Sequence, residues 1–324
     1  MAEFKVEVVK LENVNPHPNA DRLDVIPVFD YNVVNAKGKY KEGDTAIYIP
    51  VQAVLPDNII EDLNLKGKLA GSKKNRVKEV KLRGIFSEGL LYPNKDNLPV
   101  GTDVTENLGI KKYEPEVPKS LRGEVFFAGL ENVIKFDIQN IQKYPNVFKE
   151  GENVVFTEKL HGTCHIAGCK PLSDLDERLE EGRLVICSKG LLSKGLGFKH
   201  NDANSKNVYL RAAFKNKLPE ILKTLSDRYG KMFFLLGEVL GVQDFKYGLS
   251  ANDIDYRVFG AYTLHKGQKV PVNSNELDEI CNEFGLNRVP VLYQGKFSKE
   301  VLKKYTNGKE TLSGNEEHIR EGVV

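Results

Sequence analysis

The sequence predicts an α+β fold in two parts, an N-terminal β-barrel followed by a larger domain of antiparallel sheets with flanking helices. Two observations predict it. Short alternating apolar runs fill the first hundred residues, whereas longer apolar runs mix with helical patterns beyond them. The length of 324 residues also fits about two domains. We expect these domains at residues 1–110 and 131–324, joined by a linker over residues 111–130.

The first part reads as short strands divided by turn residues. The runs FKVEVVKL, DVIPVF, DTAIYIP and LLYP are separated by Asn, Pro, Gly and Asp. This pattern is typical of a small β-barrel or sandwich. The stretch KKYEPEVPKSLRG, Lys111 to Gly123, is rich in charge and proline and predicts a loop between the domains.

The second part combines strands with helices. Apolar, β-branched or aromatic runs predict strands at NVVFT, RLVICS, KMFFLLGEVL, YRVFGAYTL, VPVLYQ and HIREGVV. Capping residues and proline predict helices over residues 219–229, 275–284 and 299–305. The mixture favours a largely antiparallel sheet with helices against it.

Composition narrows the class of protein. The N-terminus, MAEFKVEVVK, lacks the apolar centre of a signal peptide, and the most apolar window, MFFLLGEVLG, is short and interrupted by Glu238. Four cysteines at irregular spacing favour buried thiols in a reducing compartment over disulfides or a zinc site. We therefore expect a monomer in the cytoplasm or nucleus, without membrane contact.

The formal net charge of +2 hides one basic cluster. From Lys66 to Arg83 the chain carries eight basic residues against the single acid Glu79. Such a run is more often a solvated surface than a binding site. It is nevertheless the strongest local charge in the sequence.

The stretch VVFTEKLHGT places Lys159 at the end of a predicted strand, just before a turn at His161 and Gly162. A lysine in such a place is most often a surface residue. A nucleophilic lysine must be neutral, so its pKa of about 10.4 has to fall through desolvation or nearby positive charge. Attack on an α-phosphate gives a phosphoramidate, from which the nucleotide can be passed on once the nitrogen is protonated.

EKLHGT resembles the KxHG nucleophile motif of ATP-dependent RNA ligases. These belong to the lysine nucleotidyltransferase superfamily, whose DNA ligases and capping guanylyltransferases have KxDG. The resemblance implies that Lys159 carries AMP and that His161 contacts phosphate or RNA. It also implies that Glu158, Leu160 and Gly162 line the nucleotide site.

Two later motifs resemble the next ones of that family. Ser188-Lys189-Gly190 follows a predicted strand, and the resemblance implies that Lys189 contacts the nucleotide ribose or RNA; an ordinary strand-end cation remains the alternative. LLGEVLG resembles the motif whose glutamate, here Glu238, binds the ribose hydroxyls. An acid inside so apolar a run needs a partner or a ligand.

Two more motifs complete the series. Tyr256-Arg257-Val258-Phe259 resembles the motif whose aromatic ring stacks on adenine, here Phe259, although a core phenylalanine is the alternative; Gly260 replaces the usual aspartate. Glu321-Gly322-Val323-Val324 resembles EGxV, which implies that Glu321 contacts Mg²⁺ or Mn²⁺ near the α-phosphate.

The resemblance covers Ile138 to Val324 and implies a nucleotidyltransferase domain of the ATP-grasp-like ligase type, with ATP as cofactor. The family's C-terminal KxK motif is absent from this chain. Because oriented cations supply much of the rate in phosphoryl transfer, we expect the chain as printed to self-adenylylate poorly.

The N-terminal stretch VVKLENVNPHPNADRLDVIPV is similar to the OB-type RNA-binding domain of tRNA-binding proteins. Plain turn chemistry is the alternative explanation of its Pro16 to Leu23 segment. OB folds bind nucleic acid with cationic loops, so we expect Lys73, Lys74, Arg76 and Lys78 to contact RNA phosphates.

An OB domain ahead of the nucleotidyltransferase domain resembles the Deinococcus- and Naegleria-type RNA ligases. The expected function is ATP-dependent joining of RNA 3′-OH and 5′-phosphate ends, free or in a nicked duplex, through lysyl-AMP and RNA-adenylate. Two alternatives stay open: a noncatalytic RNA-binding protein with a degenerate second domain, and a capping guanylyltransferase.

Overall fold

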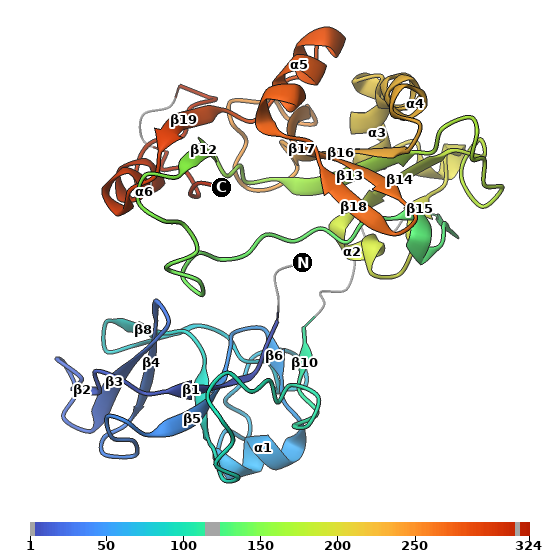
Figure 1. The fold of residues 1–324 in the computed structure, drawn as a ribbon. Helices are drawn as coiled ribbons and strands as arrows, with labels where there is room; N and C mark the ends of the chain where they lie inside the picture. Colours follow the sequence, from blue (N-terminus) through green and yellow to red (C-terminus); the bar gives the residue numbers. More distant parts are fainter. Residues whose placement is uncertain (1–3, 114–123, 315–317) are drawn as a thin grey trace. The chain divides into compact units, whose positions relative to one another are not determined.

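The computed structural model describes residues 4–113, 124–314 and 318–324 (Figure 1). Within these ranges the chain forms two compact units. One contains residues up to 113 together with Asp137–Val147, and the other contains residues 124–136 together with Phe148–Val324. Most of the expected interdomain loop, residues 114–123, lies outside the described residues.

The regular elements described in the N-terminal unit are strands apart from one short helix, with antiparallel pairing throughout the named strands. Two sheets have three strands, in the orders β1-β5-β9 and β2-β3-β4, and two have two strands, β6-β10 and β7-β8. The bounds are β1 Glu7–Lys10, β2 Asn15–Pro16, β3 Leu23–Val28, β4 Tyr31–Ala36, β5 Thr45–Ile49, β6 Ala53–Val54, α1 Asp57–Asp62, β7 Val80–Leu82, β8 Ile85–Ser87, β9 Leu90–Pro93 and β10 Lys111–Lys112. The predicted strand-rich first part is confirmed.

The turn after β2 shows why a histidine follows Pro16 there. His17 is buried, its Nδ1 accepts a hydrogen bond from the Asn19 backbone at 3.1 Å, and its Nε2 lies 3.1 Å from the Leu82 carbonyl oxygen. The ring therefore ties this turn to β7.

The larger unit is built on a five-stranded antiparallel sheet in the order β14-β13-β16-β17-β18. Two-stranded antiparallel sheets, β12-β19 and β11-β15, accompany it. The strand bounds are β11 Val125–Phe127, β12 Asn153–Thr157, β13 Thr163–Cys169, β14 Leu184–Ser188, β15 Leu196–Phe198, β16 Met232–Leu240, β17 Asp255–His265, β18 Gln268–Pro271 and β19 Val291–Lys296. The sheet confirms the predicted α+β class with antiparallel pairing.

Several helices of this unit begin or end at residues that favour those positions. The bounds are η2 Leu130–Asn132, α2 Lys189–Leu192, η3 Asp202–Asn204, α3 Val208–Lys215, α4 Leu218–Tyr229, α5 Ser274–Phe284 and α6 Lys299–Thr306. Gly230 and Gly285, both in the left-handed region, end α4 and α5. Asn273 and Ser298 accept hydrogen bonds from backbone N–H groups at the starts of α5 and α6. The three predicted helices are therefore confirmed.

The core lies where the helices meet the central sheet. α3 and α4 pack against β13, β14 and β16, and α5 packs against β17. The central strand β16 is buried along nearly its whole length. None of the helices that the structure describes combines the length and apolar character that a membrane span requires.

Candidate active site

Backbone pairing fixes the position of Lys159. At the end of β12, Thr157 exchanges two hydrogen bonds with Val324, at 2.8 and 2.9 Å, and just beyond the strand the Lys159 N–H donates to the Gly322 carbonyl at 3.0 Å. These bonds make the segment from Glu321 to Val324 an antiparallel partner of the strand end. Two sequence motifs more than 150 residues apart are thereby brought together.

The pairing places Glu321 beside the lysine amine. The Lys159 ammonium forms an ion pair with the Glu321 carboxylate, and Nδ1 of His161 lies 3.7 Å from Oε2 of the same carboxylate. The side chains are 41% and 38% exposed for Lys159 and Glu321. An ion pair exposed to solvent to this extent contributes little to stability. Lys159 and Glu321 can therefore exchange partners when a charged ligand arrives.

Glu238 is the half-buried carboxylate of the site. It lies on β16, opposite Cys164 of β13 and Arg257 of β17. Burial raises its pKa to about 7, against the attraction of Lys159 and Lys189; the negative charge of Glu321 raises the pKa further. A backbone hydrogen bond with Gly162 favours the ionised form. Glu238 therefore changes protonation near neutral pH.

Gly162 allows the turn to lie against β16. A Cβ atom at this position would come 2.4 Å from the Val239 carbonyl oxygen and 2.9 Å from Cγ of Glu238. Real Cβ atoms do not approach backbone that closely. The glycine that the resemblance assigns to the nucleotide site thus also lets two protein segments approach each other.

The loop after β16 holds this turn from the other side. The His161 N–H donates to the hydroxyl of Tyr247 at 2.7 Å, and the Gln243 amide donates to the Gly162 carbonyl. Sequence reasoning missed Tyr247 and Gln243, because neither stands in a recognisable motif. Only the fold shows that they contact the nucleophile turn.

Glu158 and Leu160 face the protein interior. The Glu158 carboxylate is 2% exposed and accepts from the Thr311 hydroxyl at 2.6 Å and from the Thr311 N–H at 3.1 Å. Leu160 is buried in a small cluster with Leu240, Tyr247 and Val289. A contact between Glu158 or Leu160 and a nucleotide would therefore have to come from the main chain.

A β-bulge sets the direction of Phe259. Leu236 of β16 pairs with Gly260 and Gly237 pairs with Val258, which leaves Phe259 without a cross-strand partner. The ring is half-buried, touches both the main core and the Leu160 cluster, and lies 5.4 Å from the ring of Phe136. It is thus partly a core residue, with an accessible part left over.

Lys189 is exposed at the start of α2, directly after β14. Its charge lowers the pKa of Glu238, which places the two groups within electrostatic reach. The residues next to Gly162 and Lys189 are joined through one tyrosine. The hydroxyl of Tyr209, on α3, hydrogen-bonds to Oγ1 of Thr163 at 2.8 Å and also to Ser188. The structure therefore gathers Lys159, His161, Glu238, Glu321 and Lys189 in one place.

The predicted RNA contacts belong to the N-terminal unit. Lys73, Lys74 and Lys78 are exposed in and after a turn closed by bridges between Ala70 and Arg76. Arg76 is half-buried, with its guanidinium 4.2 Å from the centre of the Tyr113 ring.

The four cysteines are unbridged, and three of them are buried.

Among known protein families, the RNA ligase family model matches residues 152–324, more than half of the chain, and an OB-fold domain model matches residues 5–94. None of the curated protein sequences compared with the chain matches it.

Solved structures of similar fold come from Naegleria gruberi. Naegleria gruberi RNA ligase with PPi is 22% identical, with a TM-score of 0.77 over 99% of this chain and 93% of that one. A variant of the same ligase with AMP and Mn is 21% identical, with a TM-score of 0.78 and the same coverage of both chains. A variant with ATP and Mn is 21% identical, with a TM-score of 0.75 over 98% of this chain and 92% of that one. At this identity the likeness shows a shared fold.

Proposed function

Because the chain belongs to the RNA ligase family, we propose that it is an ATP-dependent ligase that joins RNA 3′-OH and 5′-phosphate ends by way of AMP bound to Lys159. One observation carries the proposal: the Lys159 amine just after β12, the half-buried Glu238 and the exposed Glu321 meet at one turn, although they come from three distant parts of the sequence. Its solved relatives of similar fold hold ATP or AMP with Mn.

The reaction has three steps. The neutral Lys159 amine attacks the α-phosphorus of ATP, forming a phosphorus–nitrogen bond while pyrophosphate leaves. An oxygen of an RNA 5′-phosphate then attacks the same phosphorus, and the amine leaves as AMP moves to the RNA. Finally, an RNA 3′-OH attacks the 5′-phosphate phosphorus, which forms the new phosphodiester and releases AMP.

We propose the roles of the surrounding residues from the motif resemblance, and their positions agree with it. Glu238 accepts hydrogen bonds from the ribose hydroxyls, and Phe259 presents its accessible face to adenine. His161 and Lys189 contact phosphate or RNA. Main-chain groups of Glu158, Leu160 and Gly162 line the nucleotide site. In the N-terminal unit, Lys73, Lys74, Arg76 and Lys78 contact RNA phosphates.

A divalent ion fits beside Glu321. Carboxylate oxygens are the ligands that Mg²⁺ and Mn²⁺ prefer, and the mutual repulsion of Glu238 and Glu321 is what a cation would relieve. No cluster of three or more acidic, histidine or cysteine side chains suited to a metal occurs within the described part of the chain. Glu321 would therefore hold the ion together with water and phosphate oxygens. When bound, the ion supplies positive charge that favours the neutral amine and offsets charge on the α-phosphate.

The proposal also covers the location of the protein, its oligomeric state and the kind of RNA end that it joins. We place the protein in the cytoplasm or nucleus, where its four unbridged cysteines stay reduced. We propose that it acts as a monomer on free RNA ends or on nicks in a duplex that contains RNA. Sealing of a labelled nicked duplex, compared with sealing of single strands, decides between these substrates.

Covalent labelling tests the proposal. The full chain is mixed with ATP radiolabelled in the α-phosphate and with MgCl₂ or MnCl₂, then denatured and separated by electrophoresis. We expect label to accumulate slowly on the protein, and none to appear on Lys159→Ala or on Lys159→Arg, which keeps the charge but cannot act as the nucleophile. Lys194→Arg serves as the matched lysine control. Labelling by GTP instead would indicate a capping enzyme, and label retained on Lys159→Ala would refute the assignment.

A further inference from the structure

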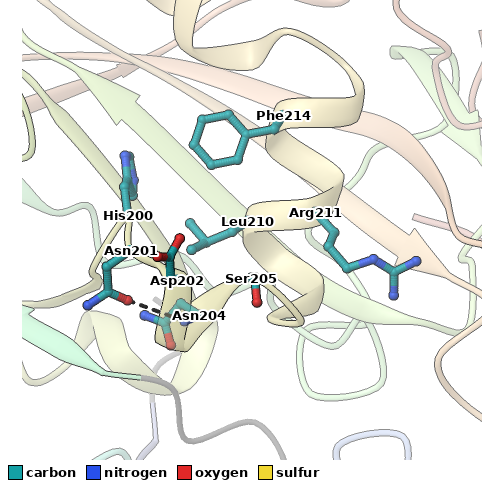
Figure 2. Close-up of a pocket in the computed structure, with 8 residues that line it drawn as sticks. All are labelled: His200, Asn201, Asp202, Asn204, Ser205, Leu210, Arg211 and Phe214. Carbon is teal, nitrogen blue, oxygen red and sulfur yellow. Dashed lines mark hydrogen bonds between the residues drawn. The ribbon is translucent and has the colours of Figure 1, made fainter.

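A cavity of about 350 Å³ lies between the segment after β15 and the outer face of α3 (Figure 2). Its lining includes His200, Asp202, Ser205, Arg211 and Phe214. None of the residues of the nucleophile turn or of the five motifs belongs to this lining. The volume is within the range of about 300–1,000 Å³ typical of small-molecule sites.

The wall of the cavity is held by one buried amide, Asn204, and one exposed amide, Asn201. Asn204 is 1% exposed; its Nδ2 donates to the carbonyls of Glu124 and Lys199 at 2.7 and 2.8 Å, and its Oδ1 accepts from the Glu124 N–H at 2.9 Å. Asn201 accepts from the Asn204 N–H at 3.2 Å, as the dashed line in Figure 2 marks. The cavity is therefore preformed.

One polar group of the lining lacks a partner. Nε2 of His200 is buried, and among residues 4–113, 124–314 and 318–324 no group hydrogen-bonds to it. Burial lowers the pKa of His200, so the ring is neutral and offers one donor or acceptor at this nitrogen. Leaving such an atom unpaired costs free energy, but it has almost no accessible surface, so a ligand could bond to it only after the groups around it shift.

Two further side chains of α3 face outward from the same lining. Phe214 is 50% exposed, and its ring stands edge-to-face with the His200 ring at 5.4 Å. Arg211, one turn earlier, is exposed and donates to the Asn252 carbonyl at 3.0 Å. Figure 2 shows the rings of His200 and Phe214 on one side of Leu210 and the guanidinium of Arg211 reaching away from them.

These groups match the parts of one nucleotide. An exposed aromatic face binds a base by stacking, and a guanidinium at the rim binds phosphate. The Asp202 carboxylate repels phosphate inside the cavity but accepts a hydrogen bond from an exocyclic amino group. Adenine, cytosine and guanine have such a group, and uracil lacks it.

We propose that this cavity binds one unpaired nucleotide of the RNA substrate, with the base against Phe214 and His200 and the phosphate at Arg211. The inference rests on the proposed function only in taking RNA as the substrate. The cavity and the nucleophile turn share a helix, because Tyr209 of α3 bonds to Thr163. An RNA strand held at the cavity is thereby held by the same helix that supports the turn.

Stacking is the direct readout. Short single-stranded RNA containing 2-aminopurine is titrated with the full chain, and fluorescence quenching reports stacking of that base. We expect Phe214→Leu to weaken binding about tenfold and to reduce the quenching, whereas Phe214→Tyr keeps both. Phe127→Leu is the matched control, because Phe127 is 59% exposed on β11 but outside the lining.

Two more variants test the proposed contacts with the edge of the base and with the phosphate. Arg211→Gln should make binding of the same RNA less dependent on salt, by about one counterion. Competition between hexamers of A and U should favour A in the parent chain, and Asp202→Ala should remove that preference. Thermal melting of each variant verifies that it is folded.

Self-adenylylation separates the two proposals. If Phe214→Leu and Arg211→Gln bind and quench like the parent chain, the cavity is not an RNA site. If Phe214→Leu loses self-adenylylation while Phe127→Leu keeps it, the cavity serves the ATP step and the inference is also overturned. If the parent chain takes up no label from ATP even after long incubation, the proposed function fails, while the RNA-binding comparison still decides the inference.

Discussion

The two carboxylates of the candidate active site stand in opposite environments. Glu321 is exposed, on a segment held to β12 by a few backbone hydrogen bonds, and it pairs with Lys159. Glu238 is largely buried, on the central strand of a five-stranded sheet, and burial raises its pKa to about 7. An exposed pair can exchange partners during a reaction, whereas a buried group holds one position. The site thus combines an adaptable side with a rigid side.

The largest expected effect tests the junction between the two sides. Gly162→Ala would place a methyl group 2.4 Å from the Val239 carbonyl oxygen. We expect self-adenylylation to fall by about 100-fold and unfolding free energy to fall by about 1–3 kcal/mol.

Gly260→Ala provides the control for that substitution. The nearest atom to a Cβ there, from Tyr262, is 4.0 Å away, so both measurements should stay near the parent values. Equal behaviour of the two variants in urea denaturation and in ATP labelling would show that Gly162 is not a close-contact position.

The next effect concerns the rigid side and its pH dependence. Burial raises the pKa of Glu238 from 4.5 to about 7, so between these values the folded chain binds a proton that the unfolded chain has released. Stability is therefore lost as pH rises through this window, by up to about 3 kcal/mol. We expect Glu238→Gln to stabilise the chain in urea at pH 8 and to have little effect at pH 5.

Glu321→Gln sharpens the contrast between the carboxylates. Its exposed ion pair is worth at most about 1 kcal/mol, so its loss should change unfolding free energy little at either pH. A stabilisation by Glu238→Gln of the same size at pH 5 and pH 8 would argue against the burial of that carboxylate.

A smaller effect separates two tyrosines. The Tyr247 hydroxyl accepts from the His161 N–H, so Tyr247→Phe should cost about 1 kcal/mol of unfolding free energy and slow self-adenylylation. The buried Tyr256 hydroxyl has no hydrogen-bond partner within the described ranges, so Tyr256→Phe should be neutral or stabilising. The reverse order of stabilities would contradict the hydrogen bonds of the structure.

The smallest effect lies in the N-terminal unit. Lys73 and Lys74 are exposed, whereas Arg76 packs on Tyr113. We expect the double variant Lys73→Gln, Lys74→Gln to lower the salt dependence of RNA binding by about one to two counterions without changing self-adenylylation. Lys39→Gln, on another turn of the same unit, is the control, and an unchanged slope in the double variant would remove the predicted contact.

Local patterns predicted much of this structure. The strand before Lys159, the three capped helices and the antiparallel sheet follow from side-chain periodicity and capping residues. β13 and α3 escaped prediction. β13 lies between two strands, so its residues are nearly all buried and show no alternation, and α3 is only eight residues long.

The sequence predicted the motif residues of the site, but not the residues that hold them in place. Glu238 and Glu321 could be chosen because each stands in a recognisable stretch. The contacts of Tyr247 with His161, of Thr311 with Glu158 and of Tyr209 with Thr163 join residues 86, 153 and 46 positions apart. Such contacts depend on the tertiary fold, which no local pattern contains. The bulge that turns Phe259 is likewise a property of pairing between two strands.

The bonds between Thr157, Lys159 and the segment from Glu321 to Val324 have a consequence for the order of folding. They close a loop of more than 150 residues, so their entropy cost is met only after the intervening sheet has formed. We expect the amides of Thr157 and Lys159 to exchange with deuterium sooner than those of β16, and equal protection would contradict this. A newly made chain would then form its stable central sheet before it positions the Lys159 amine. Incompletely folded molecules would therefore not consume ATP.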